Sequence, residues 1–328
     1  MKSKTKFVFF PLAAVLIALA CGKDGNKPAG SNCDRACLEG FAVQTLDALV
    51  GHNPSPLPKA KDVKYTENGQ RLFLGDGLWN TASARGTYSL TVADTQAGQA
   101  VFFGTIRENG SPAILAMRLK IENRSLSEIE ILVARDTAGA VRLEKLGVPH
   151  PAFLAAVPRT ERASREDLIK TADLYFTGLA RNDGKGFYPF TEDCERIENG
   201  KQTTHNPSNQ TGSFDFAAMG CKEQFESGFF RFVTRIRDRR FVAVDPERGL
   251  AMAFVFFDHA GNVPFVRLTD GRKIPIGVKR PWTWEIAELF KVERGLISRI
   301  EAIVQEAPYG MNSGWSTWED GLSERARE

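Results

Sequence analysis

Hydrophobic and polar positions follow the same order of patterns in the two halves of the chain. Each half opens with apolar residues at helical spacing, over 33–50 and over 165–179. Strand-like runs follow each helix, over 63–66, 86–93, 100–108, 113–122 and 127–135 in the first half and over 195–198, 229–237, 240–245, 250–258, 282–293 and 298–306 in the second. A helix followed by long antiparallel strands predicts an α+β fold for each half.

Three sequence matches, in the same order in both halves, support a duplication. The matched pairs are 119–135 with 290–306 (without a gap), Tyr65–Gly69 with Arg196–Gly200, and Leu46-x-x-Leu49 with Phe176-x-x-Leu179. Repeated order over a long separation is typical of a duplicated module. We therefore expect shared residues to be scaffold, and residues that only one half carries to be candidates for function.

The first twenty residues have the pattern of a secretory signal peptide. Lys2, Lys4 and Lys6 precede an apolar run that is too short to be a good bilayer-spanning helix. The sequence Ala-Leu-Ala-Cys-Gly at 18–22 resembles a bacterial lipoprotein box, in which Cys21 is acylated after cleavage. Ordinary cleavage that leaves Cys21 free is the alternative. We expect an exported protein on the periplasmic or cell-surface side of a bacterial membrane, lipid-anchored at Cys21.

Four cysteines remain after Cys21, namely Cys33, Cys37, Cys194 and Cys221. An oxidising compartment makes two disulfides the default, and pairing within each half is the sequence-local choice among three connectivities. The four histidines show no ligand-like spacing with these cysteines, which argues against a zinc site. We therefore expect disulfides and no metal.

Charge and motifs exclude several classes of function. The net charge of +3, with both signs interspersed, leaves no footprint of nucleic-acid binding. The sequence has no G-x-S-x-G motif and no glycine-rich loop that opens a helix, which disfavours covalent and nucleotide-dependent mechanisms. We expect no cofactor and no nucleic acid, and contact with a membrane only through the lipid anchor.

Four motifs carry a family resemblance, CDRACL at 33–38, YTENG at 65–69, LGDGLW at 74–79 and PYGMNSGW at 308–315. The sequences of these motifs are similar to those of an uncharacterised family of fungal and bacterial secreted proteins. The helix-then-strands plan resembles the nuclear-transport-factor-two-like superfamily, which includes SnoaL-like polyketide cyclases, steroid isomerases and limonene epoxide hydrolase. The resemblance implies a curved sheet wrapped around helices as a cone with one apolar pocket, but no particular reaction.

The resemblance and the repeat together imply two tandem cone-shaped domains. The expected segments are a signal peptide over 1–20, the lipidated cysteine and a polar tether over 21–32, a first cone over 33–148, a linker over 149–159, a second cone over 160–316 and a C-terminal tail over 317–328.

Candidate catalytic residues gather in the second half, which carries a polar loop at 202–213 and a hairpin-like stretch at 261–280 that the first half lacks. His205 or His259 would be the general acid or base, since imidazole titrates near working pH. Asp193 or Glu198 would orient the imidazole, or act as the base if an apolar cone raised its pKa.

Substrate contacts are expected from the same half. Arg196 would hold an anionic or carbonyl group, Trp284 would line a pocket mouth, and Tyr309 would belong to a tail that covers the cone. Further polar candidates for the substrate are Asp215 and Asp258. Each of these residues also has a structural alternative, such as a solvated loop, an exposed turn or an ion pair on a strand face.

A run of arginines favours an exposed sheet face on which basic and acidic side chains are mixed, with a cleft for an anionic substrate as the alternative. These arginines are Arg231, Arg235, Arg237, Arg239 and Arg240. The leading hypothesis for function is a cofactor-independent lyase, isomerase or hydrolase that uses general acid–base catalysis on a small organic or sugar-derived substrate in the second cone. The alternative is a non-catalytic lipoprotein that binds a ligand or a protein, and a homodimer is compatible with either.

Overall fold

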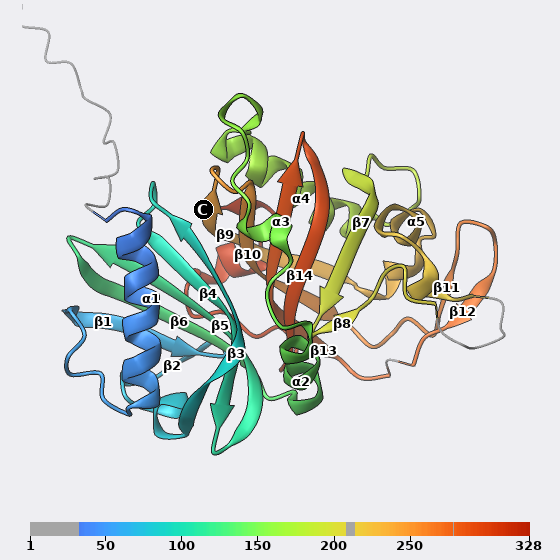
Figure 1. Ribbon diagram of the computed structural model, residues 1–328. Coiled ribbons are helices and arrows are strands. Elements are labelled where there is room, and N and C mark those ends of the chain that lie inside the picture. The colour runs from blue at the N-terminus through green and yellow to red at the C-terminus, as the bar shows by residue number, and fades with distance from the viewer. Residues whose placement is uncertain (1–32, 208–213, 278) are drawn as a thin grey trace, which may run out of the picture.

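The computed structural model describes residues 33–207, 214–277 and 279–328. Two large curved sheets and a few helices make up this part of the chain, which confirms the predicted α+β class (Figure 1). The predicted signal peptide, Cys21 and the tether lie outside the described residues, as does the end of the polar loop 202–213. None of the described helices has both the length and the apolar character that crossing a lipid bilayer requires.

The N-terminal sheet has the strand order β2-β1-β6-β5-β4-β3. Its elements are α1 (Arg35–Val50), β1 (Lys59–Glu67), β2 (Gln70–Arg71), β3 (Ala82–Asp94), β4 (Gln99–Glu108), β5 (Ser111–Glu122) and β6 (Ser125–Ala134). Helix α1 begins where the Asp34 carboxylate accepts a hydrogen bond from the backbone N–H of Cys37. It packs its apolar side on one face of this sheet and completes a filled hydrophobic core.

The C-terminal sheet has the strand order β8-β7-β14-β13-β10-β9-β15. Its strands are β7 (Phe190–Glu198), β8 (Lys201–Gln202), β9 (Arg235–Asp245), β10 (Leu250–His259), β13 (Trp282–Glu293), β14 (Leu296–Ala307) and β15 (Ala326–Arg327). Helix α4 (Arg165–Arg181) packs on one face, and α5 (Cys221–Glu226) lies beside β7. The predicted hairpin at 261–280 forms from β11 (Phe265–Arg267) and β12 (Lys273–Pro275). Shorter helices connect or end the halves, namely α2 (Thr137–Leu146), α3 (Pro151–Leu154) and α6 (Trp318–Leu322).

The predicted duplication is visible in the topology, because the first six strands of the C-terminal sheet repeat the order of the N-terminal one. In both halves the first strand pairs parallel with the last strand of the matched hairpin. Asn68 and Asn199 open the matched turns with the same positive φ of 44°. Each asparagine side chain bonds both backbone groups of its matched β-strand valine, Val133 or Val304. The shared Asn-Gly turn is therefore scaffold.

The predicted strand over 229–237 is wrong in its first part. Phe229–Phe232 form a short 3-10 helix after Gly228, whose φ of 72° turns the chain. The two strands predicted on either side of Asp238 are one strand, β9, with a bulge. Asp238 has a φ of 51°, and its buried carboxylate accepts hydrogen bonds from the hydroxyls of Ser313 and Ser316. These bonds stabilise the bulge, so the strand bends there without ending.

The predicted exposed arginine face is also wrong, because three of its arginines are buried. Arg237 pairs with Asp258 at 2.8 Å, and Arg240 pairs with Glu130 of the N-terminal sheet at 2.6 Å. Arg239 pairs with Asp173 of α4 at 3.3 Å. Buried charges are tolerated when they are paired, so these arginines join elements together instead of facing water.

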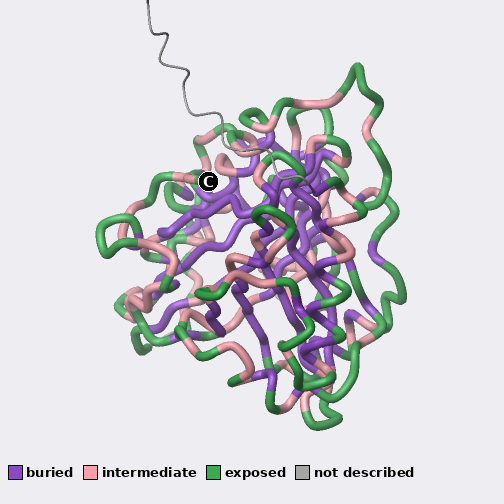
Figure 2. The backbone as a smooth tube through the Cα atoms, turned by 90° about the vertical axis from the view of Figure 1, so that its left-hand side faces the viewer, coloured by how far each residue is buried: buried purple, intermediate pink, exposed green. Residues whose placement is uncertain are grey.

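The two sheets pack against one another through one face each, and α1 and α4 lie on the opposite faces (Figure 1). Buried segments run through the interior of the molecule, and exposed turns lie at its surface (Figure 2). The shared core contains apolar side chains of β3, β4 and β5 from one sheet and of β9, β10 and β13 from the other. Polar contacts join the halves at the edges of this shared core. Both terminal guanidinium nitrogens of Arg35 donate to Asp245 at 2.8 Å. The Tyr88 hydroxyl donates to the buried carboxyl of Glu301 at 2.7 Å.

The buried carboxyl of Glu301 makes the stability of the fold depend on pH. Burial raises its pKa from 4.5 to about 7. Unfolding therefore releases a proton between these values, and the free energy of unfolding falls by about 3 kcal/mol as the pH rises through this window. We expect Glu301→Gln to remove most of that fall, measured by urea unfolding near pH 5 and near pH 8. The control Glu306→Gln changes an exposed carboxylate and should behave as the unmodified protein. An unchanged pH dependence in Glu301→Gln would contradict the account.

Candidate functional site

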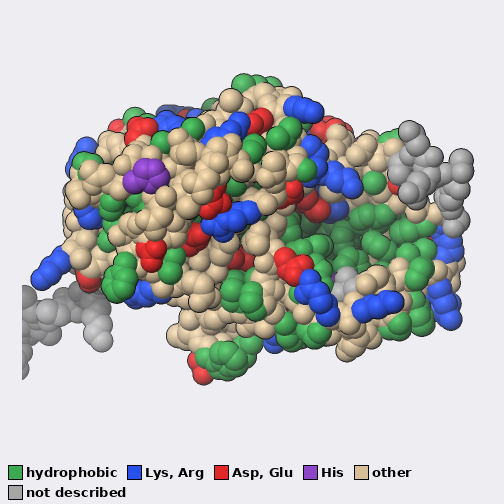
Figure 3. Space-filling view, turned by 90° about the horizontal axis from the view of Figure 1, so that it is seen from below, with side chains coloured by type: hydrophobic (Ala, Val, Ile, Leu, Met, Phe, Trp, Pro, Cys, Tyr) green, Lys and Arg blue, Asp and Glu red, His purple; other side chains and the backbone are tan. Residues whose placement is uncertain are grey.

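A cavity of about 440 Å³ lies in the C-terminal half, within the size range of small-molecule sites. Its walls come from the face of the sheet that carries α4, from α4 itself and from the segment 216–233 between β8 and β9, which we call the cap. Seen from below, the surface is hollowed on this side of the molecule, with hydrophobic side chains in the hollow and charged side chains at its rim (Figure 3).

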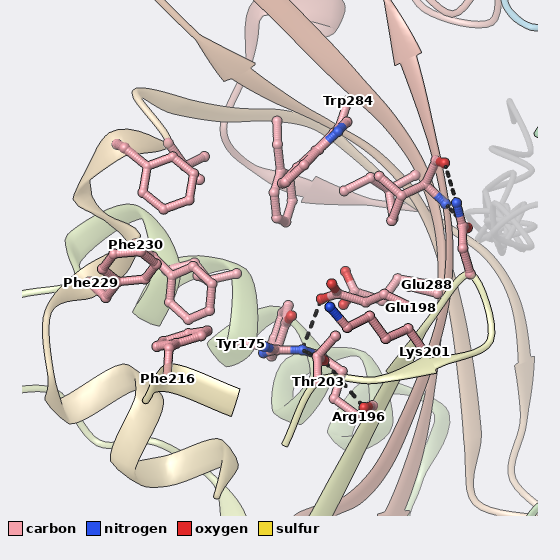
Figure 4. A pocket seen from close by; sticks show the side chains of 18 of the residues that line it. Tyr175, Arg196, Glu198, Lys201, Thr203, Phe216, Phe229, Phe230, Trp284 and Glu288 are labelled. Atoms are coloured by element: carbon pink, nitrogen blue, oxygen red, sulfur yellow. Dashed lines mark hydrogen bonds and ion pairs between the residues drawn. The ribbon is translucent and has the colours of Figure 1, made fainter. Parts of the chain in front are cut away.

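One row of side chains across the sheet shapes the floor of the cavity. The strand register places Ala253, Glu288, Ala302 and Glu198 side by side on β10, β13, β14 and β7. Glu288 therefore stands between two alanines on the face that carries the cavity. The small neighbours leave the space that the cavity occupies, and Glu288 and Glu198 both extend into it (Figure 4).

The matching row of the N-terminal half is filled with large side chains. Phe102, Met117, Ile131 and Glu67 stand there in the corresponding register. The three apolar members are buried in a closed core together with Trp79. The carboxylate of Glu67, the counterpart of Glu198, accepts a hydrogen bond from the backbone of Leu78 at 2.6 Å. The first half thus keeps the scaffold but packs this row with large side chains.

Arg196 is the centre of a polar cluster at one end of the cavity. Only 1% of its surface is exposed, and its Nε lies 2.9 Å from Glu198 Oε1. Its Nη2 donates to Gln224 Oε1 at 2.5 Å, and its Nε donates to Thr203 Oγ1 at 3.0 Å. The remaining nitrogen, Nη1, has no hydrogen-bond partner within the described part of the chain. The matched residue of the first half is Tyr65, so this cation belongs to the second half alone.

Glu288 is a buried carboxyl whose charge is unfavourable. Its pKa is raised from 4.5 to about 8, mainly by burial and to a smaller extent by the neighbouring charge of Glu198. A hydrogen bond with Tyr175 and the charge of Arg196 act in the opposite direction but are smaller. Glu288 is therefore mainly protonated at neutral pH, beside the ion pair of Glu198 and Arg196. Two carboxyl groups with different environments are what general acid–base catalysis requires.

Aromatic side chains line the other end of the cavity. From the cap come Phe216, Phe229, Phe230 and Phe232, with ring centroids of Phe216 and Phe229 4.7 Å apart. Trp284 lies on the sheet and faces these rings across the cavity (Figure 4). The Arg196 guanidinium lies 5.4 Å from the centroid of Phe230, where the aromatic and polar ends meet.

The cap is fixed to the sheet close to Arg196. The predicted disulfide Cys194–Cys221 is present and joins β7 to α5, and Cys33–Cys37 is the second predicted bridge. Gln224 links the cap to the cluster, because its amide nitrogen donates to the backbone oxygens of Thr203 and Phe216 at 2.6 and 2.9 Å. The disulfides indicate an extracellular or otherwise oxidising compartment.

Three predicted site residues meet in this cavity, namely Arg196, Glu198 and Trp284. Asp193 on β7 and His205 in the segment after β8 are exposed, and neither lines the cavity. Asp215 precedes the short 3-10 helix Phe216–Ala218 and does not line the cavity. Tyr309 is 48% exposed beyond β14. The described residues contain no group of three or more side chains that could hold a metal ion.

Asp258 and His259 are fully buried but lie away from the cavity lining. Asp258 points to the opposite face of β10, where Arg237 and the Thr283 hydroxyl bond it. His259 stacks on Trp282 with ring centroids 4.0 Å apart and packs edge-on against Trp284, behind the cavity wall. The structure therefore places both as supports of the sheet end, where neither reaches the cavity.

Sequence reasoning missed Glu288 and Tyr175. The signal for Glu288 is present, since it interrupts the alternating apolar positions Trp284, Ile286 and Phe290 of one strand face. Tyr175 likewise lies on the apolar side of α4, next to Phe176. An ionisable residue on a predicted core face is either paired or functional.

Comparison with known proteins matches residues 161–304 to a domain of unknown function, DUF8021. The curated proteins contain no significant match. Similar solved structures include a de novo designed protein with a curved β-sheet, which is 18% identical over 44% of this chain and 88% of its own, with a TM-score of 0.25. The epoxide hydrolase/cyclase-like enzyme SalBIII, of pyran ring formation in salinomycin, is 11% identical over 43% of this chain and 92% of its own, with a TM-score of 0.28. AclR from Streptomyces galilaeus is 14% identical over 39% of this chain and 92% of its own, with a TM-score of 0.27.

The buried position of His259 predicts an acid-sensitive fold. Burial lowers its pKa from 6.5 to about 4, so the unfolded chain binds an additional proton between these values. The neutral, buried His259 therefore contributes its full share to the free energy of unfolding above pH 6.5. As the pH falls from 6.5 to about 4, the free energy of unfolding decreases by up to about 3 kcal/mol. We expect His259→Phe to keep the ring stack and to reduce this acid loss in urea titrations. His205→Ala is the control, because His205 is exposed. If both variants lose stability with acid as the unmodified protein does, His259 is not the cause.

Proposed function

We propose that the protein is an exported, lipid-anchored enzyme without a cofactor, which carries out a lyase, isomerase or hydrolase step by general acid–base catalysis in the cavity of the C-terminal half. The observation that carries the proposal is Glu288, a carboxyl group protonated at neutral pH, next to the ion pair of Arg196 and Glu198. In the other half, Met117, Tyr65 and Glu67 hold these three positions, and Met117 and Tyr65 are packed in the closed core.

The proposed roles follow from the charge of each group. Glu288 donates its proton to an oxygen of the substrate, and Glu198 accepts a proton released elsewhere on the same molecule. Arg196 stabilises negative charge that develops on the substrate oxygen, because its Nη1 is free of partners among the described residues. Tyr175 holds Glu288 in place through their hydrogen bond.

The proposal includes the finer architecture and the location of the protein. Each half would be a cone-shaped domain of the nuclear-transport-factor-two-like type, and only the second would keep its hollow. Both disulfides support export into an oxidising compartment. The anchor at Cys21 and the bacterial periplasmic or cell-surface location stay predictions from the sequence.

A binding lipoprotein is the second candidate, which the aromatic lining alone would support. The two candidates differ in what Glu288 does. In a binder, Glu288 is only a hydrogen-bond donor, and glutamine can replace it. In an acid catalyst, Glu288 transfers a proton, which glutamine cannot do.

The test is a screen of small organic compounds followed by mass spectrometry, with Glu288→Gln beside the unmodified protein. We expect a product whose rate of formation falls about 100-fold or more in Glu288→Gln. The rate of the unmodified protein should also fall above about pH 8, since Glu288 then loses the proton that it donates. His205→Ala is the matched control and should leave the rate unchanged, because His205 lies outside the cavity. Full turnover by Glu288→Gln would refute acid catalysis by Glu288, and compounds that bind both proteins equally without reacting would identify a binder.

A further inference from the structure

We propose that the cavity takes a flat, ring-bearing apolar molecule with a hydrogen-bond-accepting oxygen, either a ketone or a carboxylate, at one end. This substrate class rests on the acid–base function proposed above and adds to it the shape and polarity of the molecule. The basis is the separation of the lining into an aromatic end and a donor-rich end (Figure 4).

The aromatic end is built for a ring between two walls. Phe216, Phe229 and Phe230 form one wall, with neighbouring ring centroids of 4.7 and 5.1 Å. Trp284 belongs to the other wall, and His259 and Trp282 stiffen it from behind. Aromatic side chains favour offset or edge-on contact with another ring, which adds to the gain from burying its apolar area.

The aromatic wall of the cavity comes from a long insertion in the C-terminal half. Between β8 and β9 the C-terminal half has residues 203–234, where the N-terminal half connects β2 to β3 through residues 72–81. The insertion contains the four phenylalanines that line the cavity, and a disulfide fixes it at Cys221. In the first half, Trp79 and Leu78 of the shorter connection are buried in the closed core. The cap therefore encloses a space on the side of the sheet where the first half packs Leu78 and Trp79 into its core.

The polar end presents mainly donors. At this end Arg196 has one buried nitrogen, Nη1, without a hydrogen-bond partner among the described residues, and Glu288 carries a proton at neutral pH. Lys201 lies exposed at the rim and forms no ion pair within the parts of the chain that the structure describes. One oxygen of Glu198, Oε1, is paired with Arg196. Donors select an acceptor, so a carbonyl or carboxylate oxygen fits this end and an ammonium group does not.

The experiment measures binding of four probes by isothermal titration calorimetry with the purified protein. 2-Naphthoate and 2-acetylnaphthalene carry a ring and an acceptor oxygen, 2-naphthylmethylamine carries a ring and a cation, and octanoate carries an acceptor oxygen without a ring. We expect one or both naphthyl oxygen compounds to bind at least about tenfold more tightly than the amine and octanoate. The tighter of the two identifies the head group as a carboxylate or a ketone. Equal affinity of the amine or octanoate would overturn the proposal.

Variants assign the binding to the two ends of the cavity. Trp284→Leu and Phe229→Leu should each weaken the naphthyl oxygen probes about tenfold. Two positions are used so that the result does not depend on the folding of one variant, which circular dichroism checks. Lys201→Met should weaken naphthoate more than acetylnaphthalene, and Lys222→Met, an exposed lysine of α5 outside the lining, should change neither. Folded Trp284→Leu and Phe229→Leu proteins with undiminished affinity would place the probes elsewhere and overturn the proposal.

Glu288→Gln separates this proposal from the reaction. Glutamine keeps a donor, so naphthyl probes should bind within about threefold of the unmodified protein while turnover is lost. If Glu288→Gln abolishes turnover but the probes show no selectivity, the substrate class is wrong and the reaction stands. If the probes bind as expected but turnover does not depend on Glu288, the reaction is wrong and the ligand class stands.

Discussion

The side chains of one row across each sheet determine whether the space between that sheet and its helix is filled or hollow in the described structure. Both halves use the same ladder of strands, with the same Asn-Gly turn bonded to the same position of the last hairpin strand. Across that ladder, the first half places Phe102, Met117 and Ile131, and the second places Ala253, Glu288 and Ala302. Two alanines beside a carboxyl group leave a hollow, and the loss of hydration in it keeps that carboxyl protonated.

The packing of the two sheets makes this arrangement rigid. Each sheet gives one face to a shared apolar core, so its other face is left for its own helix. Ion pairs of Arg35 and Arg240 join the halves at the edges of that core. The floor of the cavity is therefore one side of a sheet whose other side is fully packed. A site built on such a floor keeps the positions of its charged groups, which electrostatic catalysis needs.

Much of the fold could be predicted because it depends on local pattern and on repetition. The duplicated topology and the α+β class followed from the residue pattern, and the pairing of cysteines within each half was the sequence-local choice among three. The arginine run could not be placed from spacing, because Glu130, the partner of Arg240, comes from the other half of the chain. The bulge at Asp238 likewise depends on Ser313 and Ser316 of the distant tail.

The candidate site was predicted in part, for a related reason. Arg196 and Glu198 were predicted because they lie on the strand that precedes the polar loop with His205. Glu288 was missed because the hollow beside it is left by Ala302 and Ala253, which are its neighbours in the sheet but not in the chain. The loop residue His205 attracted attention by its chemistry, but the structure leaves it exposed.

The measurement that tests this account most directly is the titration of the Glu288 carboxyl carbon by nuclear magnetic resonance, in protein labelled with carbon-13 at its glutamate side chains. Glu288→Gln assigns the signal by its disappearance. The account predicts a midpoint near pH 8, because the group is buried between alanines in an apolar cavity. A midpoint near 4.5, the ordinary value for glutamate, would show that water reaches the group and would contradict the central claim.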